Sequence, residues 1–121
     1  MKVIVAGGRD IEDFMTVTKA IMQGLVYLNA YSLTKPIEIV SGMARGVDSL
    51  AIEFASAIGY SIKTFPADWD KYGKSAGPTR NKQMAEYSDA LIAIWDGKSR
   101  GTKNMIVQME KIGKPVYVHR I

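Results

Sequence analysis

The chain has 121 residues, 47% apolar and 23% charged, a balance typical of one ordinary globular domain spanning 1–121. No apolar run approaches the roughly 18 residues of a membrane span, and the N-terminus is unlike a signal peptide, so we expect a cytoplasmic protein without membrane contact. The lack of cysteine excludes disulfides and cysteine-based zinc sites, and the net charge of +4 suits a partner that carries phosphate.

The chain opens with a short apolar run, which predicts a buried strand over 1–6 that stops at Gly7 and Gly8. Asp10 is a residue type that caps helices, so a helix is expected directly after it. The stripe of that helix consists of Ile11, Phe14, Thr18, Ile21, Leu25 and Leu28.

A second unit of strand and helix follows Pro36, which ends a loop. The strand is predicted over 37–41, and the helix after it ends at Gly59, a residue that favours helix termination. A third strand is expected over 60–65. The inward stripe of the second helix consists of Val47, Leu50, Ala51, Phe54, Ala55 and Ile58.

The second half of the chain begins with a predicted polar loop over 66–77. Pro78 fits the first turn of a helix that runs to about Ser88 and buries Met84 and Tyr87. A fourth strand is predicted over 90–95. A last helix is expected to open at Thr102, and a fifth strand covers 116–120; the inward residues of that helix are Met105, Ile106, Met109 and Ile112.

Apolar strands that alternate with amphipathic helices are typical of a parallel sheet covered on both faces. With right-handed crossovers, the expected fold is a Rossmann-like three-layer α/β/α sandwich with a five-stranded parallel sheet.

The loops that leave the predicted strands are unusual in composition. Glycine, arginine and short polar residues concentrate in all four, over 7–10, 41–48, 66–81 and 96–102, whereas the loops that enter strands are ordinary. Ligands of such folds bind at the carboxyl ends of the strands. Glycines allow close backbone approach, helix N-termini favour anions, and arginines suit phosphate, so the loops together predict a phosphorylated small ligand.

Neither common phosphate motif is present. The sequence contains no G-x-x-x-x-G-K-[ST], and "GGRDIE" departs from G-x-G-x-x-G. His119 has no ligand partners at metal spacing, so no metal site and no cofactor are predicted.

Several loop residues have two interpretations. Gly42 and Gly46 either admit a ligand or only form a turn, and Arg45 contacts phosphate, a partner subunit or solvent. Asp48 is either a functional carboxylate or a residue that complements the helix dipole. Trp69, with Tyr72, either stacks on a base or covers the core.

The four loops in order, "GGRD", "SGMARGVDSLA", "FPADWDKYGKSAGPTRNKQM" and "DGKSRGTKNMI", resemble the YspA-type branch of the SLOG superfamily. The resemblance covers nearly the whole chain. It implies a Rossmann-like domain that binds nucleotides or their derivatives, a phage or prophage setting, and a homo-oligomer, dimer or higher. The superfamily also includes the Lonely-guy phosphoribohydrolases, which cleave the N-glycosidic bond of nucleoside monophosphates, and the DNA-processing protein DprA.

The Lonely-guy signatures carry over in part. Arg80-Asn81 is similar to the Arg-Lys pair of those enzymes, which implies that Arg80 contacts ribose or phosphate. "DGKSRGT" is similar to P-G-G-x-G-T-x-x-E, which implies a phosphate-binding helix start at Gly101 and Thr102. The motif glutamate is replaced by Met105, and Asp96 stands where that motif begins with proline.

Three functions are therefore expected in order: nucleotide binding or sensing, cleavage of an N-glycosidic bond, and DprA-like nucleic-acid binding. The candidate catalytic residues are Asp48 and Arg80. The candidate ligand-binding residues are Gly7, Gly8, Arg9, Asp10, Ser41, Gly42, Arg45, Gly46, Asp68, Trp69, Asn81, Ser99, Gly101 and Thr102.

Overall fold

A computed structural model describes residues 1–28 and 36–121, so most of the predicted loop before Pro36 lies outside the described residues. The strands are β1 (Lys2–Gly7), β2 (Glu38–Ser41), β3 (Ser61–Thr64), β4 (Ala90–Trp95) and β5 (Val116–Arg120). The helices are α1 (Phe14–Tyr27), α2 (Val47–Ile58), α3 (Trp69–Tyr72), α4 (Ala76–Tyr87) and α5 (Arg100–Lys111), with a 3₁₀ turn over Gly73–Ser75. No helix in the described part of the chain is long and apolar enough to cross a membrane.

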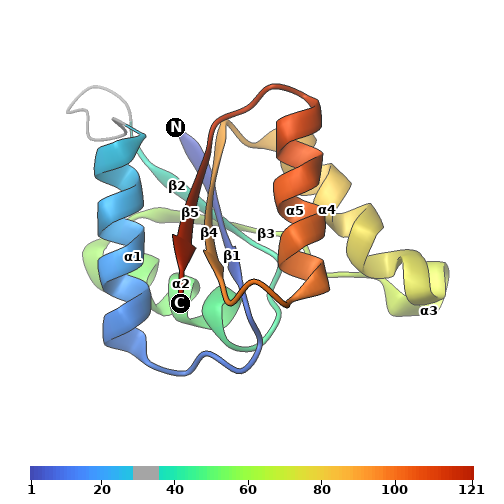
Figure 1. Ribbon diagram of the computed structural model, residues 1–121, viewed down its shortest axis with the longest axis horizontal. Coiled ribbons are helices and arrows are strands. Elements are labelled where there is room, and N and C mark those ends of the chain that lie inside the picture. The colour runs from blue at the N-terminus through green and yellow to red at the C-terminus, as the bar shows by residue number, and fades with distance from the viewer. Residues whose placement is uncertain (29–35) are drawn as a thin grey trace.

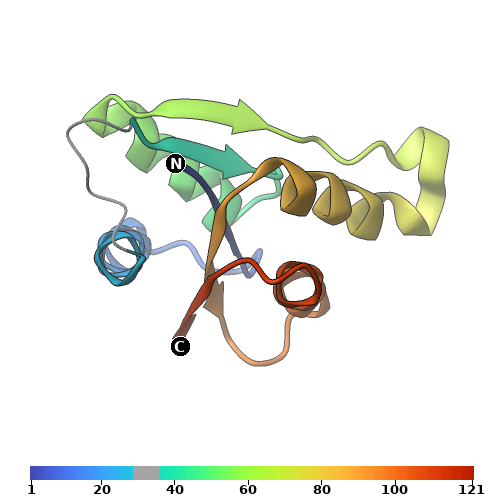
Figure 2. The ribbon, with the colours of Figure 1, turned by 90° about the horizontal axis from the view of Figure 1, so that it is seen from above.

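The strands form one parallel sheet in the order β3-β2-β1-β4-β5. Helices α1 and α2 cover one face of this sheet, and α4 and α5 cover the other (Figures 1 and 2). The expected Rossmann-like three-layer sandwich is confirmed. The strand order reverses between β1 and β4, and this is the position where ligands bind in open α/β sheets.

Alternating side chains of the central strands supply both halves of the core. Val3 and Val5 of β1 pack with α1 and α2, whereas Ile4 and Ala6 pack with α4 and α5. Side chains point alternately to the two faces of a strand, so a strand covered on both faces must be apolar throughout. The outer strands differ, because β3 has no fully buried residue and β5 is only half-buried.

The first helix begins later than Asp10. Asp13 caps α1 instead, and its side chain accepts hydrogen bonds from the Met15 N–H at 3.1 Å and the Thr16 hydroxyl at 2.8 Å. Asp10 stays in the loop, where its carboxylate lies 3.4 Å from Arg45. The prediction of Asp10 as a helix cap was therefore wrong, because a second capping residue follows it within the same loop.

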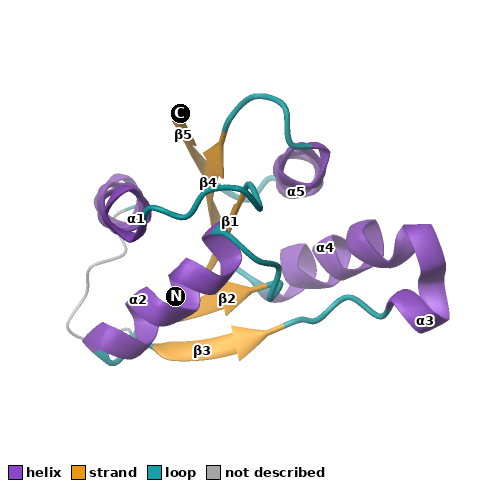
Figure 3. Ribbon diagram, turned by 90° about the horizontal axis from the view of Figure 1, so that it is seen from below, coloured by secondary structure: helices purple, strands orange, loops and turns teal. Residues whose placement is uncertain are grey.

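The predicted loop over 66–77 is largely helical. Asp68 accepts a hydrogen bond from the Lys71 N–H at 3.1 Å and caps the single turn α3, and a 3₁₀ turn leads into α4, where Pro78 occupies the first turn as expected. Figure 3 shows α3 and the start of α4 beyond the carboxyl end of β3. The polar composition concealed these turns because they bury almost nothing.

Three smaller expectations were also wrong. The last helix opens at Arg100 because Ser99 caps it, two residues before Thr102. Ile58 and Ile112, both predicted to point inward, are each 49% exposed, and Ile112 lies beyond the end of α5. Tyr87 packs against the core as expected but is half-buried, and its hydroxyl donates a hydrogen bond to the Glu38 carboxylate.

Candidate functional site

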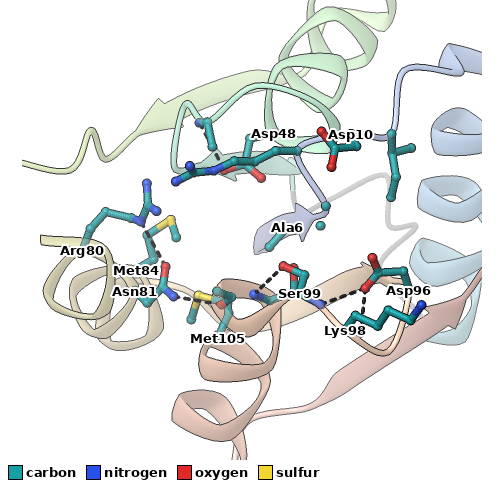
Figure 4. A pocket seen from close by; sticks show the side chains of 17 residues that line it. Ala6, Asp10, Asp48, Arg80, Asn81, Met84, Asp96, Lys98, Ser99 and Met105 are labelled. Atoms are coloured by element: carbon teal, nitrogen blue, oxygen red, sulfur yellow. Dashed lines mark hydrogen bonds between the residues drawn. The ribbon is translucent and has the colours of Figure 1, made fainter. Parts of the chain in front are cut away.

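A cleft of about 400 Å³ lies at the carboxyl edge of the sheet, where the strand order reverses. In Figure 4, Asp48 and Asp10 lie on one side of it, Ser99, Lys98 and Asp96 on another. The residues that line the cleft are Ala6, Gly7, Gly8, Arg9, Asp10, Ile11, Ala44, Asp48, Arg80, Asn81, Met84, Asp96, Lys98, Ser99, Gly101, Thr102 and Met105. Loops after β1, β2 and β4 and the inner faces of α4 and α5 thus meet at one place.

The start of α5 presents backbone N–H groups to the cleft. Ser99 caps the helix by accepting a hydrogen bond from the Thr102 N–H at 3.4 Å, and its carbonyl oxygen accepts one from Lys103 at 3.1 Å. The first four N–H groups of a helix lack partners within the helix, so those of Arg100 and Gly101 stay available. A Cβ added at Gly101 would meet no atom within 4 Å, so the space beside this helix start is open.

Asp96 shapes the loop that leads into α5. Its carboxylate accepts hydrogen bonds from the Lys98 N–H at 2.7 Å and the Ser99 N–H at 2.8 Å, and these bonds lower the pKa of Asp96. The carboxylate therefore binds two backbone N–H groups in the residues just before α5. The N–H groups of Lys98 and Ser99 are thus bonded to Asp96, whereas those of Arg100 and Gly101 have no partner within the helix.

The charged groups of Asp48 and Arg80 both approach Gly42 and attract each other without direct hydrogen bonding. The Arg80 guanidinium donates to the Gly42 carbonyl oxygen at 2.6 Å, and the Ala44 N–H donates to the Asp48 carboxylate at 3.4 Å. A Cβ at Gly42 would clash with the Arg80 guanidinium and sit 3.0 Å from the Asp48 carboxylate. Glycine at this position therefore lets both charged groups approach the same loop.

Burial is the main influence on the pKa of Asp48, which is 6% exposed. Loss of hydration raises the pKa of Asp48 to about 6, and the attraction of the Arg80 guanidinium offsets only part of that rise. Burial also lowers the pKa of Arg80. A carboxyl group that titrates close to neutral pH and lines a cleft is a candidate for a functional role.

Asn81 ties Arg80 to the start of α5. Its side-chain oxygen accepts a hydrogen bond from Arg80 Nε at 3.0 Å. Its side-chain nitrogen donates to the Gly101 carbonyl oxygen at 3.2 Å and to Asn104 at 3.0 Å. Asn81 is 5% exposed, so the side chain that orients Arg80 is almost entirely buried.

The floor of the cleft is apolar at the position of the Lonely-guy glutamate. Met105 is 1% exposed and lies beside Met84, which is 2% exposed. The carboxylates that line the cleft are instead Asp10, Asp48 and Asp96, and its cations are Arg9, Arg80 and Lys98. The cleft is thus formally balanced in charge when all three aspartates are ionised.

A second hollow, of about 560 Å³, adjoins the cleft. It shares Arg9, Ala44 and Arg80 with the cleft, and it also includes Gly42, Met43, Arg45, Pro66, Ala67 and Trp69. Of the sequence-predicted residues, Gly42, Arg45 and Trp69 lie here rather than in the cleft. Trp69 is 53% exposed, so the interpretation that it folds back to cover the core was wrong.

Three predicted site residues line neither hollow. The buried Ser41 hydroxyl donates to the Asp48 carbonyl oxygen at 3.1 Å, and Asp68 caps α3. Gly46 has φ +78°, and a Cβ there would sit 2.6 Å from the Arg9 carbonyl oxygen. Gly46 thus packs the β2–α2 loop against the β1–α1 loop, and the Val47 N–H donates to the Gly8 carbonyl oxygen at 3.3 Å.

Other lining residues were missed from sequence. Lys98 and Asp96 lie within the loop over 96–102 that was singled out, so their polarity and position could have identified them. Ile11, Ala44 and Met84 carry no such signal, because apolar residues at these positions are equally consistent with core packing.

Comparison with known proteins identifies a curated relative and a family. The Gene 61 protein of Mycobacterium phage D29 is 32% identical, in an alignment that covers 95% of this chain and 93% of that protein. Residues 1–72 match the family described as YspA, cpYpsA-related SLOG.

Solved structures share the fold. DNA processing protein A (DprA) from Streptococcus pneumoniae superposes with a TM-score of 0.71 at 20% identity, over 97% of this chain and 49% of that one. The chain therefore spans about half the length of that protein. DprA from Helicobacter pylori, studied for its single-stranded DNA binding mode, gives 0.65 at 22% identity, over 98% of this chain and 64% of that one.

A third structure, TM1055, gives a TM-score of 0.64 at 16% identity, over 95% of this chain and 71% of that one. The structural likenesses show the fold, whereas the family match and the phage relative show the family. The chain belongs to the YspA, cpYpsA-related SLOG family.

Proposed function

We propose that this protein binds a nucleotide or a nucleotide derivative in the cleft at the carboxyl edge of the sheet. The observation that carries the proposal is the convergence, at the point where strand order reverses, of an open helix start at Gly101 with Arg9, Arg80 and Lys98. Backbone N–H groups at a helix N-terminus and arginine side chains are the groups that bind phosphate in such folds.

The ligand's phosphate is best accommodated at the start of α5. Gly101 leaves space beside the N–H groups of the first turn, and Lys98 adds a positive charge to the same wall. The apolar floor at Met84 and Met105 suits the less polar part of the ligand, its ribose or base. A cleft of about 400 Å³ falls within the usual size of small-molecule sites.

A second candidate is hydrolysis of the ligand's N-glycosidic bond, which Asp48 favours. Such a reaction needs a carboxylate near the reacting carbon to stabilise positive charge or to position water. Asp48 lines the cleft and titrates near neutral pH, because burial raises its pKa to about 6. We rank this candidate below binding because Met105 replaces the glutamate of the Lonely-guy enzymes.

Nucleic-acid binding is the third candidate. The likeness to the DprA structures supports it, and one of those proteins binds single-stranded DNA. The three arginines of the two hollows would serve a phosphate chain as well as a small ligand. Self-association remains a prediction from the family resemblance, and a cytoplasmic setting remains a prediction from the composition.

The first prediction tests nucleotide binding directly. Nucleoside monophosphates, cyclic nucleotides and ADP-ribose are added to the protein, and the melting temperature and the release of free base are measured. Stabilisation without base release supports binding. Arg9→Ala should weaken the affinity about 10-fold or more, because Arg9 is exposed and supplies a charged donor.

The matched control is Lys82→Ala, which removes an exposed cation of α4 outside both hollows and should leave the affinity unchanged. Base release that disappears in Asp48→Asn would instead favour the hydrolase. If no nucleotide raises the melting temperature, the proposed function is wrong.

A further inference from the structure

The cleft and the second hollow are two compartments of one site. Arg9, Ala44 and Arg80 line both, so the boundary between them carries two guanidinium groups. Arg80 is anchored there, since it donates to the Gly42 carbonyl oxygen at 2.6 Å and to Asn81 at 3.0 Å. An anion at this boundary would therefore meet one preorganised arginine and one exposed arginine.

The two compartments differ in charge. Three carboxylates balance the cations of the cleft, whereas the second hollow is lined by Arg9, Arg45 and Arg80 and by no carboxylate among the described residues. Arg45 is paired at 3.4 Å with Asp10, whose carboxylate is almost fully exposed, so that pair is screened by water. The guanidinium groups of Arg9 and Arg80 therefore lie together where the second hollow meets the cleft.

The second hollow also offers an aromatic surface that the core does not use. Trp69 is 53% exposed, and its ring packs loosely on the start of α4, where a Cβ at Gly77 would lie 3.8 Å away. Met43 is 52% exposed and is held at φ +61°, an uncommon conformation for a residue with a side chain. Indole rings in positively charged hollows bind nucleobases by stacking.

We propose that the physiological ligand contains two nucleosides joined through one or two bridging phosphates, with its second base stacked on Trp69. This inference rests on the proposed function. It adds that a mononucleotide fills only the cleft, that the bridging phosphate lies between Arg9 and Arg80, and that the second hollow holds the other nucleoside. A two-base ligand explains why three arginines surround a hollow that also exposes a tryptophan.

A long single strand is a poorer fit to the same features. Strand-binding proteins carry a charged groove that follows the backbone over several nucleotides. Here Arg9, Arg45 and Arg80 surround a single hollow, and the cleft beside it is lined by as many carboxylates as cations. The ligand is therefore expected to have two bases.

The second prediction tests this inference by calorimetric titration with three probes. AMP carries one base, the 3′–5′ linked dinucleotide pApA has one bridging phosphate, and the 5′–5′ linked diadenosine diphosphate has two. At least one of the two-base probes should bind about 10-fold more tightly than AMP, and whichever does so identifies the linkage. Trp69→Ala should remove that advantage, a loss of about 10-fold, and leave the affinity for AMP unchanged.

Tyr72→Ala is the matched control, because Tyr72 lies on the same short helix but outside the second hollow. It should preserve the preference for the two-base probe and so separate stacking from damage to α3. If AMP binds and neither two-base probe binds more tightly, or if Trp69→Ala weakens every probe equally, the inference is overturned and the proposed function stands.

Two other results overturn the inference in different ways. If no probe binds, the inference is overturned, and the proposed function fails with it when the nucleotide panel of the first prediction fails too. If the affinity for oligodeoxyadenylates keeps rising beyond two nucleotides, a nucleic-acid strand is the occupant.

Discussion

Asp48 is a carboxylate held almost entirely out of water in the wall of the cleft. Its neighbours, the Arg80 guanidinium and the Ala44 N–H, compensate only part of the lost hydration, so its pKa rises from 3.8 to about 6. A rise of this size corresponds to about 3 kcal/mol that ionised Asp48 costs the folded protein. A residue that destabilises the fold at neutral pH is expected at a site where function requires the charge.

The third prediction concerns the pH dependence of stability. Because the pKa of Asp48 is higher in the folded than in the unfolded chain, its contribution to stability is greatest below about pH 4 and is lost as pH rises through about 6. The side chain of Asp48→Asn does not titrate. The free energy of unfolding of this variant, minus that of the parent, should therefore rise by as much as about 3 kcal/mol between pH 4 and pH 7.5. Urea unfolding at both pH values measures this difference.

An equal effect of Asp48→Asn at pH 4 and pH 7.5 would contradict the raised pKa. Asp13→Asn is a useful contrast, since hydrogen bonds from Thr16 and Met15 lower the pKa of Asp13. Because the pKa of Asp13 is lowered, Asp13→Asn should destabilise the protein more at pH 7.5 than at pH 4.

At the residue scale, the sequence identified which residues carry functional groups but not which of these residues are buried. The spacing of Asp48 from the end of the second strand placed it at the helix start, and the structure finds it there. Its burial depends on Gly42, Arg80 and the β1 loop, which come from distant parts of the chain. No local pattern could distinguish it from Asp10, which is exposed.

At the element scale, two glycines at helix starts have different structural roles. Gly46, before α2, has φ +78° and faces the carbonyl oxygens of Gly8 and Arg9. Gly101, in the first turn of α5, faces open space. Both were candidate ligand-binding residues, Gly46 with a turn as its alternative and Gly101 by resemblance, but only Gly101 lines the cleft.

The fourth prediction compares alanine at these two positions. Gly46→Ala should lower the free energy of unfolding by about 3 kcal/mol, because strain and a backbone clash add together. Gly101→Ala should leave stability unchanged or raise it by up to about 1 kcal/mol, since alanine favours helix. The same Gly101 variant should weaken mononucleotide binding, because its methyl group occupies the space beside the helix start.

Urea unfolding and calorimetric titration measure the two effects separately. Unchanged affinity in Gly101→Ala would place the phosphate elsewhere than α5.

The element boundaries show what local sequence can predict. The runs over 90–95 and 116–120 were predicted to the residue, since apolar strands bounded by polar turns are unambiguous. Capping is harder, because Asp10 and Asp13 are equally good caps by type. Only the packing of Phe14 and Val17 on the core decides which of them begins the helix.

At the scale of the whole molecule, only a minority of the 16 lysine and arginine residues lie at the candidate site. The net charge is +4, yet the cations of the cleft and its neighbouring hollow are only Arg9, Arg45, Arg80 and Lys98. A nucleic-acid strand could therefore meet about four of them at most.

The fifth prediction follows from counterion release. Single-stranded DNA releases about 0.7 counterion per neutralised phosphate, so four contacts limit the slope of log K against log salt to about −3. Fluorescence anisotropy with a labelled single-stranded oligonucleotide between low and physiological salt measures this slope. A markedly steeper slope would require a basic track outside the two hollows and would favour DprA-like binding.

The sequence by itself determined the fold class, the order of strands and helices, and the edge of the sheet where unusual loops gather. The elements follow from hydrophobic periodicity, which is a local property of the chain. The edge follows because the carboxyl ends of parallel strands meet at one edge of the sheet. Tertiary structure decided which loop residues line the cleft. Ser41 and Gly46 were turned to packing, Asp48 was buried, and Trp69 was left exposed, because burial and contact depend on segments brought together only by the fold.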